Sequence, residues 1–256
     1  MKKDEAIFNK GLTLLEQNSV PEALACFEQA VRLNPQRSEY FLELGATYQK
    51  VGELAKSLDC FQKGVALNPQ EPILQYNLGL TYSYTGDNQR AKIHLSKAIE
   101  INPNFGAAYN NLGAVLHKLG DLVEAIRVYE AGIHVDPSNP KSFNNLGLSQ
   151  MKMGDVEKAA ACYLRAIQMD RTYAEPYYNL GLLLMKLDLE KAKENFLQAV
   201  RYDPMKYQAH TNLSAIYYRQ GELETAFEHA EKALAINPNF MPARTNYDTI
   251  KKELGR

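Results

Sequence analysis

One interval governs this sequence: residues of the same kind return every 34 positions along most of its 256 residues. Proline follows the interval at Pro35, Pro69, Pro103 and Pro137. A Leu-Gly pair follows it too, with its glycines at Gly45, Gly79, Gly113, Gly147 and Gly181. The interval is too long for one helix or strand. It predicts an array of similar units, each of which buries its apolar face against the next.

Each unit contains two runs of apolar residues at helical spacing. In the fourth unit the runs are Tyr109, Leu112, Val115 and Leu116, followed by Ala125, Ile126, Tyr129 and Ile133. Such spacing places the apolar side chains on one face of a helix. Gly120 separates the runs, at a point where glycine can end a helix in left-handed backbone without strain. We therefore predict a helical hairpin in which Asp121 caps the second helix and Pro137 ends it.

Small residues also flank a bulky residue in the second half of each unit, as Ala125, Tyr129 and Gly132 do in the fourth. The interval, the Leu-Gly pair, this small-bulky-small order and the closing proline together resemble the tetratricopeptide repeat family. The resemblance covers essentially the whole chain. It implies an all-α, right-handed α-solenoid of seven helical hairpins plus a C-terminal capping helix. The hairpins are expected at about 4–37, 38–71, 72–105, 106–139, 140–173, 174–206 and 207–240, and the capping helix at 241–256.

Some units depart from the pattern. The sixth is one residue short and lacks the turn glycine, so its inter-helix turn must be tighter or built differently. Arg171 stands where the fifth proline belongs, and Asn18 replaces the first turn glycine. Asparagine also tolerates left-handed backbone, so we expect Asn18 to make the same turn.

Charge and composition exclude several classes of partner. A formal net charge of −1 gives no general electrostatic reason to bind nucleic acid or an anionic membrane. Three widely spaced cysteines do not form a disulfide framework, which favours a reducing compartment. No apolar run reaches the ~18–20 residues that a membrane span needs, and the N-terminus has no signal-length apolar segment. We expect a cytoplasmic protein with no membrane span and no nucleic-acid partner.

Motifs of catalysis are absent from the sequence. It has no glycine-rich phosphate loop, no two-histidine zinc helix and no nucleophile elbow. One column suggests metal binding, because it contains Cys26, Cys60, His94, Cys162 and His229. Equivalent helices of adjacent repeats lie on the order of 8–10 Å apart, however, whereas zinc ligands lie within ~2.3 Å of the ion. We predict no enzymatic activity, no metal and no cofactor.

The position before the repeated leucine holds asparagine in five successive hairpins and again in the capping helix. The row comprises Asn77, Asn111, Asn145, Asn179, Asn212 and Asn246. In the resembling family the first helix of each hairpin lines the inner face, so the row is expected to point into a groove. Each amide offers a donor and an acceptor, and a row of them could hold an extended peptide by its backbone. The alternative is that these amides connect neighbouring helices, with their side chains needed for stability.

The repeat arm of the O-linked N-acetylglucosamine transferase has an asparagine row to which this stretch is similar. The transferase's catalytic region has no counterpart here, so the resemblance implies binding only. Lys118, Lys152 and Lys186 lie at the ends of first helices and could attract an acidic peptide. Lysine at this position is also common in the resembling family, so a solvated helix end is the favoured account.

These features predict a non-enzymatic scaffold that binds an extended peptide segment of a partner protein in its concave groove. The alternative is a structural scaffold that assembles with itself through an apolar N-terminal groove containing Phe8, Leu12, Leu15 and Leu42. We expect a monomer rather than an oligomer.

Overall fold

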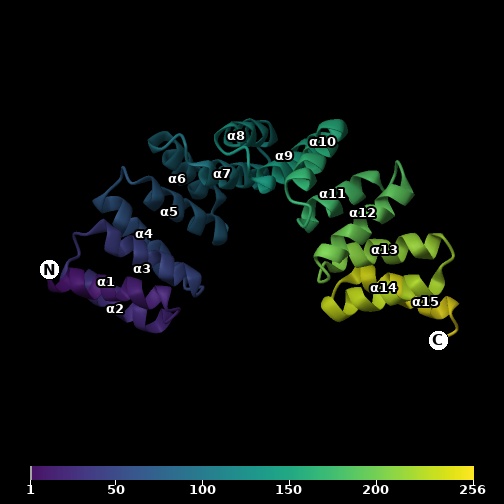
Figure 1. Ribbon diagram of the computed structural model, residues 1–256, viewed down its shortest axis with the longest axis horizontal. Coiled ribbons are helices and arrows are strands. Elements are labelled where there is room, and N and C mark those ends of the chain that lie inside the picture. The colour runs from purple at the N-terminus through teal and green to yellow at the C-terminus, as the bar shows by residue number, and fades with distance from the viewer. Residues whose placement is uncertain (1) are drawn as a thin grey trace. The chain divides into compact units, whose positions relative to one another are not determined.

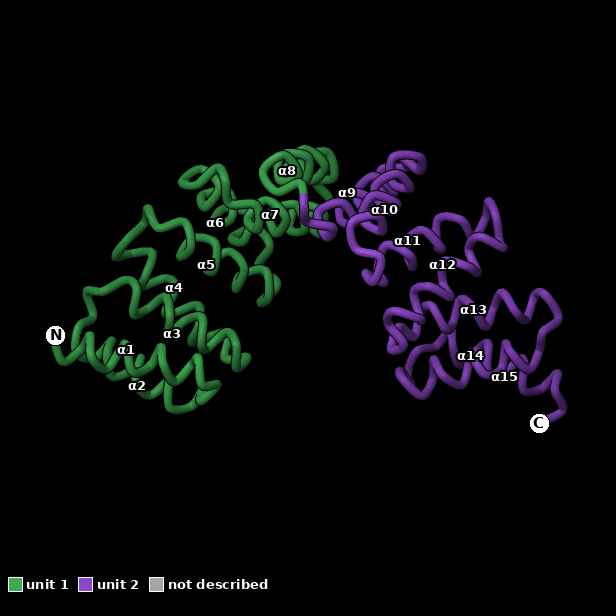
Figure 2. The backbone as a smooth tube through the Cα atoms, in the orientation of Figure 1, with its two compact units in different colours: residues 1–137 green, residues 138–256 purple. Residues whose placement is uncertain are grey.

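A computed structural model describes residues 2–256, and within that range it contains fifteen helices and no strand (Figure 1). The chain divides into two compact units, residues 1–137 and 138–256 (Figure 2). The first unit contains α1 (Lys3–Glu16), α2 (Val20–Leu33), α3 (Ser38–Lys50), α4 (Leu54–Leu67), α5 (Pro72–Tyr84), α6 (Asn88–Ile101), α7 (Gly106–Leu119) and α8 (Leu122–Val135). The second contains α9 (Pro140–Met153), α10 (Val156–Met169), α11 (Ala174–Leu184), α12 (Leu189–Tyr202), α13 (Tyr207–Arg219), α14 (Leu223–Ile236) and α15 (Met241–Glu253).

The helices pack as hairpins, from α1 with α2 to α13 with α14, and α15 follows alone. Within each unit the second helix of a hairpin also packs on the first helix of the next, as α2 does on α3 and α14 on α15. This arrangement confirms the predicted fold class, an all-helical array of seven hairpins with a C-terminal helix. The division into two units is a feature that the repeat interval does not reveal.

In the first six hairpins, the repeated glycine of the first helix packs against the bulky residue of the second helix. Tyr129 of α8 is 2% exposed and lies directly against Gly113 of α7. A Cβ atom at Gly113 would lie 2.5 Å from Tyr129 Cε1, closer than atoms can pack. Gly45 faces Phe61 in the same way, with a distance of 2.8 Å. Glycine therefore recurs because a ring of the second helix occupies the space of its missing side chain.

Most inter-helix turns within the hairpins use left-handed backbone at one residue. Gly120 has φ of 85°, and Asn18 takes the same role with φ of 60°, which confirms both predictions. Asp121 does stand at the N-cap of α8, but its side chain does not cap the helix. Its carboxylate instead pairs with Lys92 Nζ on α6 at 3.0 Å, so the expected capping bond is wrong.

The turn between α11 and α12 is built differently, as the missing glycine predicts. α11 is the shortest of the fifteen helices of residues 2–256, and no residue from Met185 to Asp188 has a positive φ. Asp188 N donates to the Leu184 carbonyl at 2.8 Å, which closes the turn. Asp188 Oδ1 then accepts from Lys191 N at 3.0 Å and caps α12. A carboxylate that caps the second helix thus replaces the glycine turn.

Between hairpins, an asparagine or aspartate follows each second helix, and most of these side chains hold the turn before the next first helix. Asn102 Oδ1 accepts from Asn104 N at 3.1 Å, and this turn also contains the repeated proline. Asp170 does the same where Arg171 replaces proline: its Oδ1 accepts from Thr172 N at 2.9 Å and from Thr172 Oγ1 at 2.7 Å. The side chain holds the turn that proline would otherwise have stiffened.

Candidate functional site

The first helices form the inner layer of each unit. In the first unit α3 contacts α5 and α5 contacts α7, and in the second unit α9 contacts α11 and α13 contacts α15. No two second helices of the same unit reach comparable contact among the described residues. Helices that approach on one side of a stack and diverge on the other give that stack local curvature. The first-helix side is therefore the inner side.

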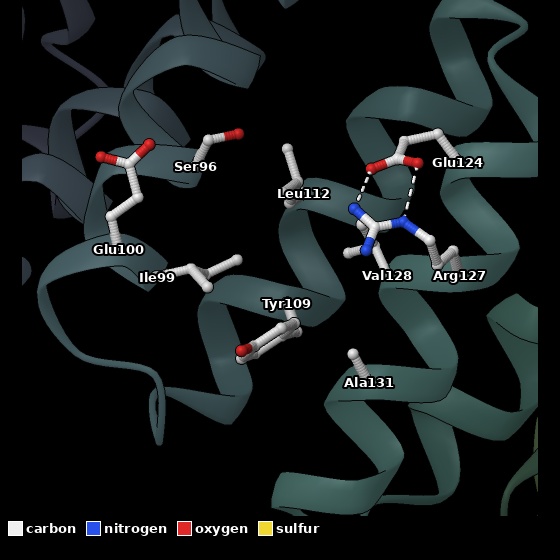
Figure 3. A pocket seen from close by; sticks show the side chains of 9 residues that line it. All are labelled: Ser96, Ile99, Glu100, Tyr109, Leu112, Glu124, Arg127, Val128 and Ala131. Atoms are coloured by element: carbon white, nitrogen blue, oxygen red, sulfur yellow. Dashed lines mark hydrogen bonds and ion pairs between the residues drawn. The ribbon is translucent and has the colours of Figure 1, made fainter.

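Hollows occur on the opposite side, where second helices diverge. One lies between α6 and α8, and Figure 3 shows Ile99 and Val128 on its two walls with Tyr109 of α7 between them. The Glu124–Arg127 ion pair lies at its edge (Figure 3). A second hollow lies between α2 and α4 and is lined by Val31, Arg32, Pro35, Phe41, Lys63, Ala66 and Leu67. None of the predicted site residues lines these outer hollows.

In the first unit the asparagine row forms defined hydrogen bonds. Asn111 Nδ2 donates to the hydroxyl of Tyr76 on α5 at 2.9 Å and to the carbonyl of Ala107 at 3.0 Å. Asn77 Nδ2 donates to the carbonyl of Ile73, one turn earlier in its own helix, at 2.9 Å. Within residues 2–256, the Oδ1 atoms of Asn77 and Asn111 accept no hydrogen bond. The NH2 group of each amide is hydrogen-bonded, whereas the amide oxygen accepts no hydrogen bond.

In the second unit one asparagine of the row is buried. Asn179 is 9% exposed, and its Nδ2 donates to Asn144 Oδ1 on α9 at 2.9 Å. Asn144 in turn donates to Asn145 Oδ1 at 3.4 Å. The sequence predicts side chains that face solvent in the free groove, and for Asn179 this is wrong. The neighbouring helix approaches closely enough to bury it.

The same connection recurs between the later helices. Asn246 Nδ2 of α15 donates to the Thr211 carbonyl of α13 at 3.1 Å. Asn212 hydrogen-bonds the hydroxyl of Tyr178 on α11, which opposes the larger effect of burial that raises the pKa of that tyrosine. Each of these asparagines reaches the residue just before its counterpart in the preceding hairpin. The inter-helix bonds that the sequence left as an alternative are thus present in the free chain.

The lysines at the ends of the first helices are open to solvent. Lys118, Lys152 and Lys186 are exposed. Within residues 2–256 none of them belongs to an ion pair. Their charges are available to a ligand.

The apolar N-terminal residues also pack against the core of the first hairpins. The Phe8 ring stacks on Tyr40 with centroids 4.5 Å apart and contacts Phe27 at 5.5 Å. Leu12 and Leu15 pack against the same buried cluster. Phe8, Leu12, Leu15 and Leu42 are nevertheless only half-buried, so self-assembly through this groove stays a prediction.

Two histidines form a contact that the sequence did not predict, because they are 19 residues apart. His210 of α13 and His229 of α14 place their Nδ1 atoms 2.9 Å from each other, and His210 Nε2 lies 3.2 Å from the Pro204 carbonyl. Tyr217 stacks on His229 with centroids 5.5 Å apart. Burial lowers the pKa of both histidines, with added repulsion from Lys232, and brings that of His229 to about 4.

This pair predicts a loss of stability in acid. The pKa of each folded histidine lies below its unfolded value of roughly 6.5, so the fold favours the neutral rings. The contribution of these neutral rings to the free energy of unfolding is fully present above that value, and it is lost as pH drops from about 6.5 towards 4. The free energy of unfolding should fall by about 1–2 kcal/mol after allowance for partial exposure. Urea denaturation at pH 7 and 4.5 measures it. His229→Gln should flatten the profile and His134→Gln, at an exposed site, should not; equal profiles for all three proteins would contradict the assignment.

Residues 2–256 contain no group of three or more His, Cys, Asp or Glu side chains that could hold a metal ion. In the same range no helix has both the length and the apolar character needed to cross a bilayer.

An all-helical stack of hairpins with an inner first-helix face defines a class of repeat protein, and family models identify which one. Models described as TPR repeat or tetratricopeptide repeat match residues 11–52, 38–71, 74–105, 94–127, 116–154, 151–188 and 183–239. The chain belongs to the tetratricopeptide repeat family. The family fold is typically a protein-interaction scaffold, not a catalyst.

Solved structures agree on the fold. A tetratricopeptide repeat protein from Parabacteroides merdae aligns with a TM-score of 0.77 and 14% identity, covering 96% of this chain and 98% of that one. The Cut9-Hcn1 hetero-tetramer of the APC/C aligns with a TM-score of 0.74 and 18% identity over 97% of this chain, which spans 53% of the other chain's length. YrrB, described as a TPR protein with an unusual peptide-binding site, aligns with a TM-score of 0.54 and 25% identity, covering 72% of this chain and 96% of YrrB. No curated protein sequence matches the chain.

Proposed function

We propose that this protein binds an extended peptide segment of a partner protein on its first-helix face, without catalysis. The observation that carries the proposal is the half-used amide of the asparagine row. Asn111 Nδ2 is fixed by Tyr76 and Ala107, while its Oδ1 accepts nothing in the free chain. One hairpin earlier, Asn77 Nδ2 bonds only the Ile73 carbonyl of its own helix, and its Oδ1 also accepts nothing. A peptide N–H could donate to each of these oxygens.

The fixed donor half also reduces the cost of binding. A flexible side chain loses rotamer freedom when it grips a ligand, at about 0.5–1.5 kcal/mol each. Asn111 and Asn179 have already lost that freedom through their bonds to the preceding first helix. The row is therefore preorganised to contact a ligand backbone. YrrB, which is similar over most of its length, is described as having a peptide-binding site and supports the same class of ligand.

Backbone recognition predicts a specific response to N-methylation. A random-sequence peptide library displayed on phage would first supply a peptide selected on the full chain. Synthetic copies of it would then carry N-methyl groups at single positions. Loss of one N–H···Oδ1 bond should weaken binding by about 0.5–1.5 kcal/mol, at positions that recur along the peptide. If every methylated peptide bound as tightly as the parent, recognition by the row of amides would be excluded.

A further inference from the structure

The first-helix face of the second unit differs in charge from the chain as a whole. The protein has a formal net charge of −1. Yet α9 and α13 contain no acidic residue, and α11 contains only Glu175. That carboxylate is already neutralised, since Lys206 Nζ lies 2.6 Å from its Oε1. Helices α9, α11 and α13 therefore offer a ligand almost no negative charge, whereas α15 contains Asp248 and Glu253.

Three cations stand on the same face without an acidic partner. Lys152 lies in the last turn of α9, Lys186 in the turn after α11, and Arg219 at the end of α13. All three are exposed, and within residues 2–256 none belongs to an ion pair. Cations elsewhere in the unit are paired more often, as Lys158 is with Asp155 and Lys191 with Asp188. The unpaired row marks this face as complementary to negative charge.

Apolar side chains lie beside this row. Leu148 is 37% exposed, Met151 40% and Leu182 43%. Leu148 precedes Lys152 by four residues and Leu182 precedes Lys186 by four, so each leucine lies one helical turn from its lysine. Because Leu148 and Leu182 occupy equivalent positions in adjacent hairpins, they form a short apolar strip along the row of cations. Large exposed apolar groups next to charges are typical of a binding surface.

The first unit lacks this combination. The equivalent positions there are Glu16, Lys50, Tyr84 and Lys118, so the cations are interrupted by an acid and an aromatic residue. In the second unit Lys152, Lys186 and Arg219 are consecutive, and Glu253 of α15 follows them.

We propose that the first-helix face of the second unit selects a peptide segment with acidic residues next to large apolar ones. The acidic side chains contact Lys152, Lys186 and Arg219, and the apolar ones contact Leu148 and Leu182. This inference rests on the proposed function and specifies its ligand. The asparagine row holds the peptide backbone, while the cations and leucines choose among sequences.

The test uses the random-sequence phage library with the full chain as bait. Selected peptides should be enriched in Asp or Glu and in Leu, Ile, Met or Phe. Enriched peptides without acidic residues would overturn the present inference and leave the proposed function standing. No enrichment over an empty support would overturn both.

A charge-reversal variant then locates the contact. Lys152→Glu, Lys186→Glu and Arg219→Glu together should weaken binding of a selected acidic peptide about tenfold to a hundredfold. The matched control is Lys158→Glu, Arg165→Glu and Arg201→Glu, which makes the same change of net charge on α10 and α12. The control should change affinity less than threefold, and added salt should weaken only the unmodified and control proteins.

Two results would overturn the location. Equal losses in the two variants would mean that overall charge, and not this face, attracts the peptide. Light scattering provides the other check. If the unmodified chain forms an oligomer and the reversal variant is a monomer, a second copy of the chain occupies this face.

Discussion

Replacing Tyr129 with alanine is expected to lower the free energy of unfolding by about 3–5 kcal/mol, the usual cost of removing a fully buried aromatic ring. Tyr129 is 2% exposed, and its ring lies against the backbone of Gly113. The cavity would separate α7 from α8. In a repeat array each hairpin stabilises only its neighbours, so the damage should concentrate in the first unit.

Urea denaturation followed by circular dichroism measures this loss. The matched control is Tyr84→Ala, since the side chain of Tyr84 is 58% exposed and the same atoms are removed from the surface. Its effect should stay within about 0.5 kcal/mol. Similar losses in the two variants would show that the bulky column does not form the core of the hairpins.

Removing residues 241–256 is expected to produce aggregation and a lower melting temperature. Helix α15 covers the last hairpin: Ile250 is 1% exposed, and Tyr247 stacks on Phe227 of α14 with centroids 4.9 Å apart. Without α15, Phe227 would be open to water. An exposed apolar face at the end of a stack invites association with other copies, which terminal helices of repeat proteins prevent.

A point substitution separates this covering role from chain length. Ile250→Glu places a charge inside the interface of α15 and should imitate the truncation. Thr249→Glu makes the same addition at the neighbouring exposed position and should have little effect. Light scattering and thermal denaturation measure both. A truncated protein as soluble and as heat-resistant as the full chain would refute the covering role.

The fold was predictable because the repeated residues each have one physical task. The ring of Tyr129 requires glycine at position 113, and left-handed turns favour Gly120 and Asn18. These positions therefore indicate the hairpins in the sequence. Where one side chain has two possible hydrogen-bond partners, the sequence did not indicate which one it bonds. Asp121 stands at an N-cap yet bonds Lys92, because the ion pair and the cap compete for one carboxylate.

The candidate site was predictable in position but not in its bonding. The asparagine row follows from the repeat interval alone. That Asn179 reaches Asn144 depends on how closely α9 and α11 approach, which no local pattern specifies. The His210–His229 contact was missed for the same reason, since it joins two helices across a hairpin. The cations of the second unit were visible in sequence, but their lack of partners was not.

The central claim is that the asparagine row of the first helices binds a peptide backbone, and a double variant tests it most directly. Asn111→Ala and Asn212→Ala remove two half-buried amides of the row, each bonded to the preceding first helix. The control is Asn195→Ala on α12, where Nδ2 donates to the Lys191 carbonyl of its own helix at 2.8 Å. Affinity for a library-selected peptide is measured well below the melting temperature of every variant, so that unfolding does not contribute.

The double variant should lose about 1–3 kcal/mol of binding free energy, at about 0.5–1.5 kcal/mol per asparagine. Its melting temperature should also fall by a few degrees, because two inter-helix hydrogen bonds are lost. The control should bind normally. A lowered melting temperature with unchanged affinity would show that the asparagines only connect helices, and would contradict the account.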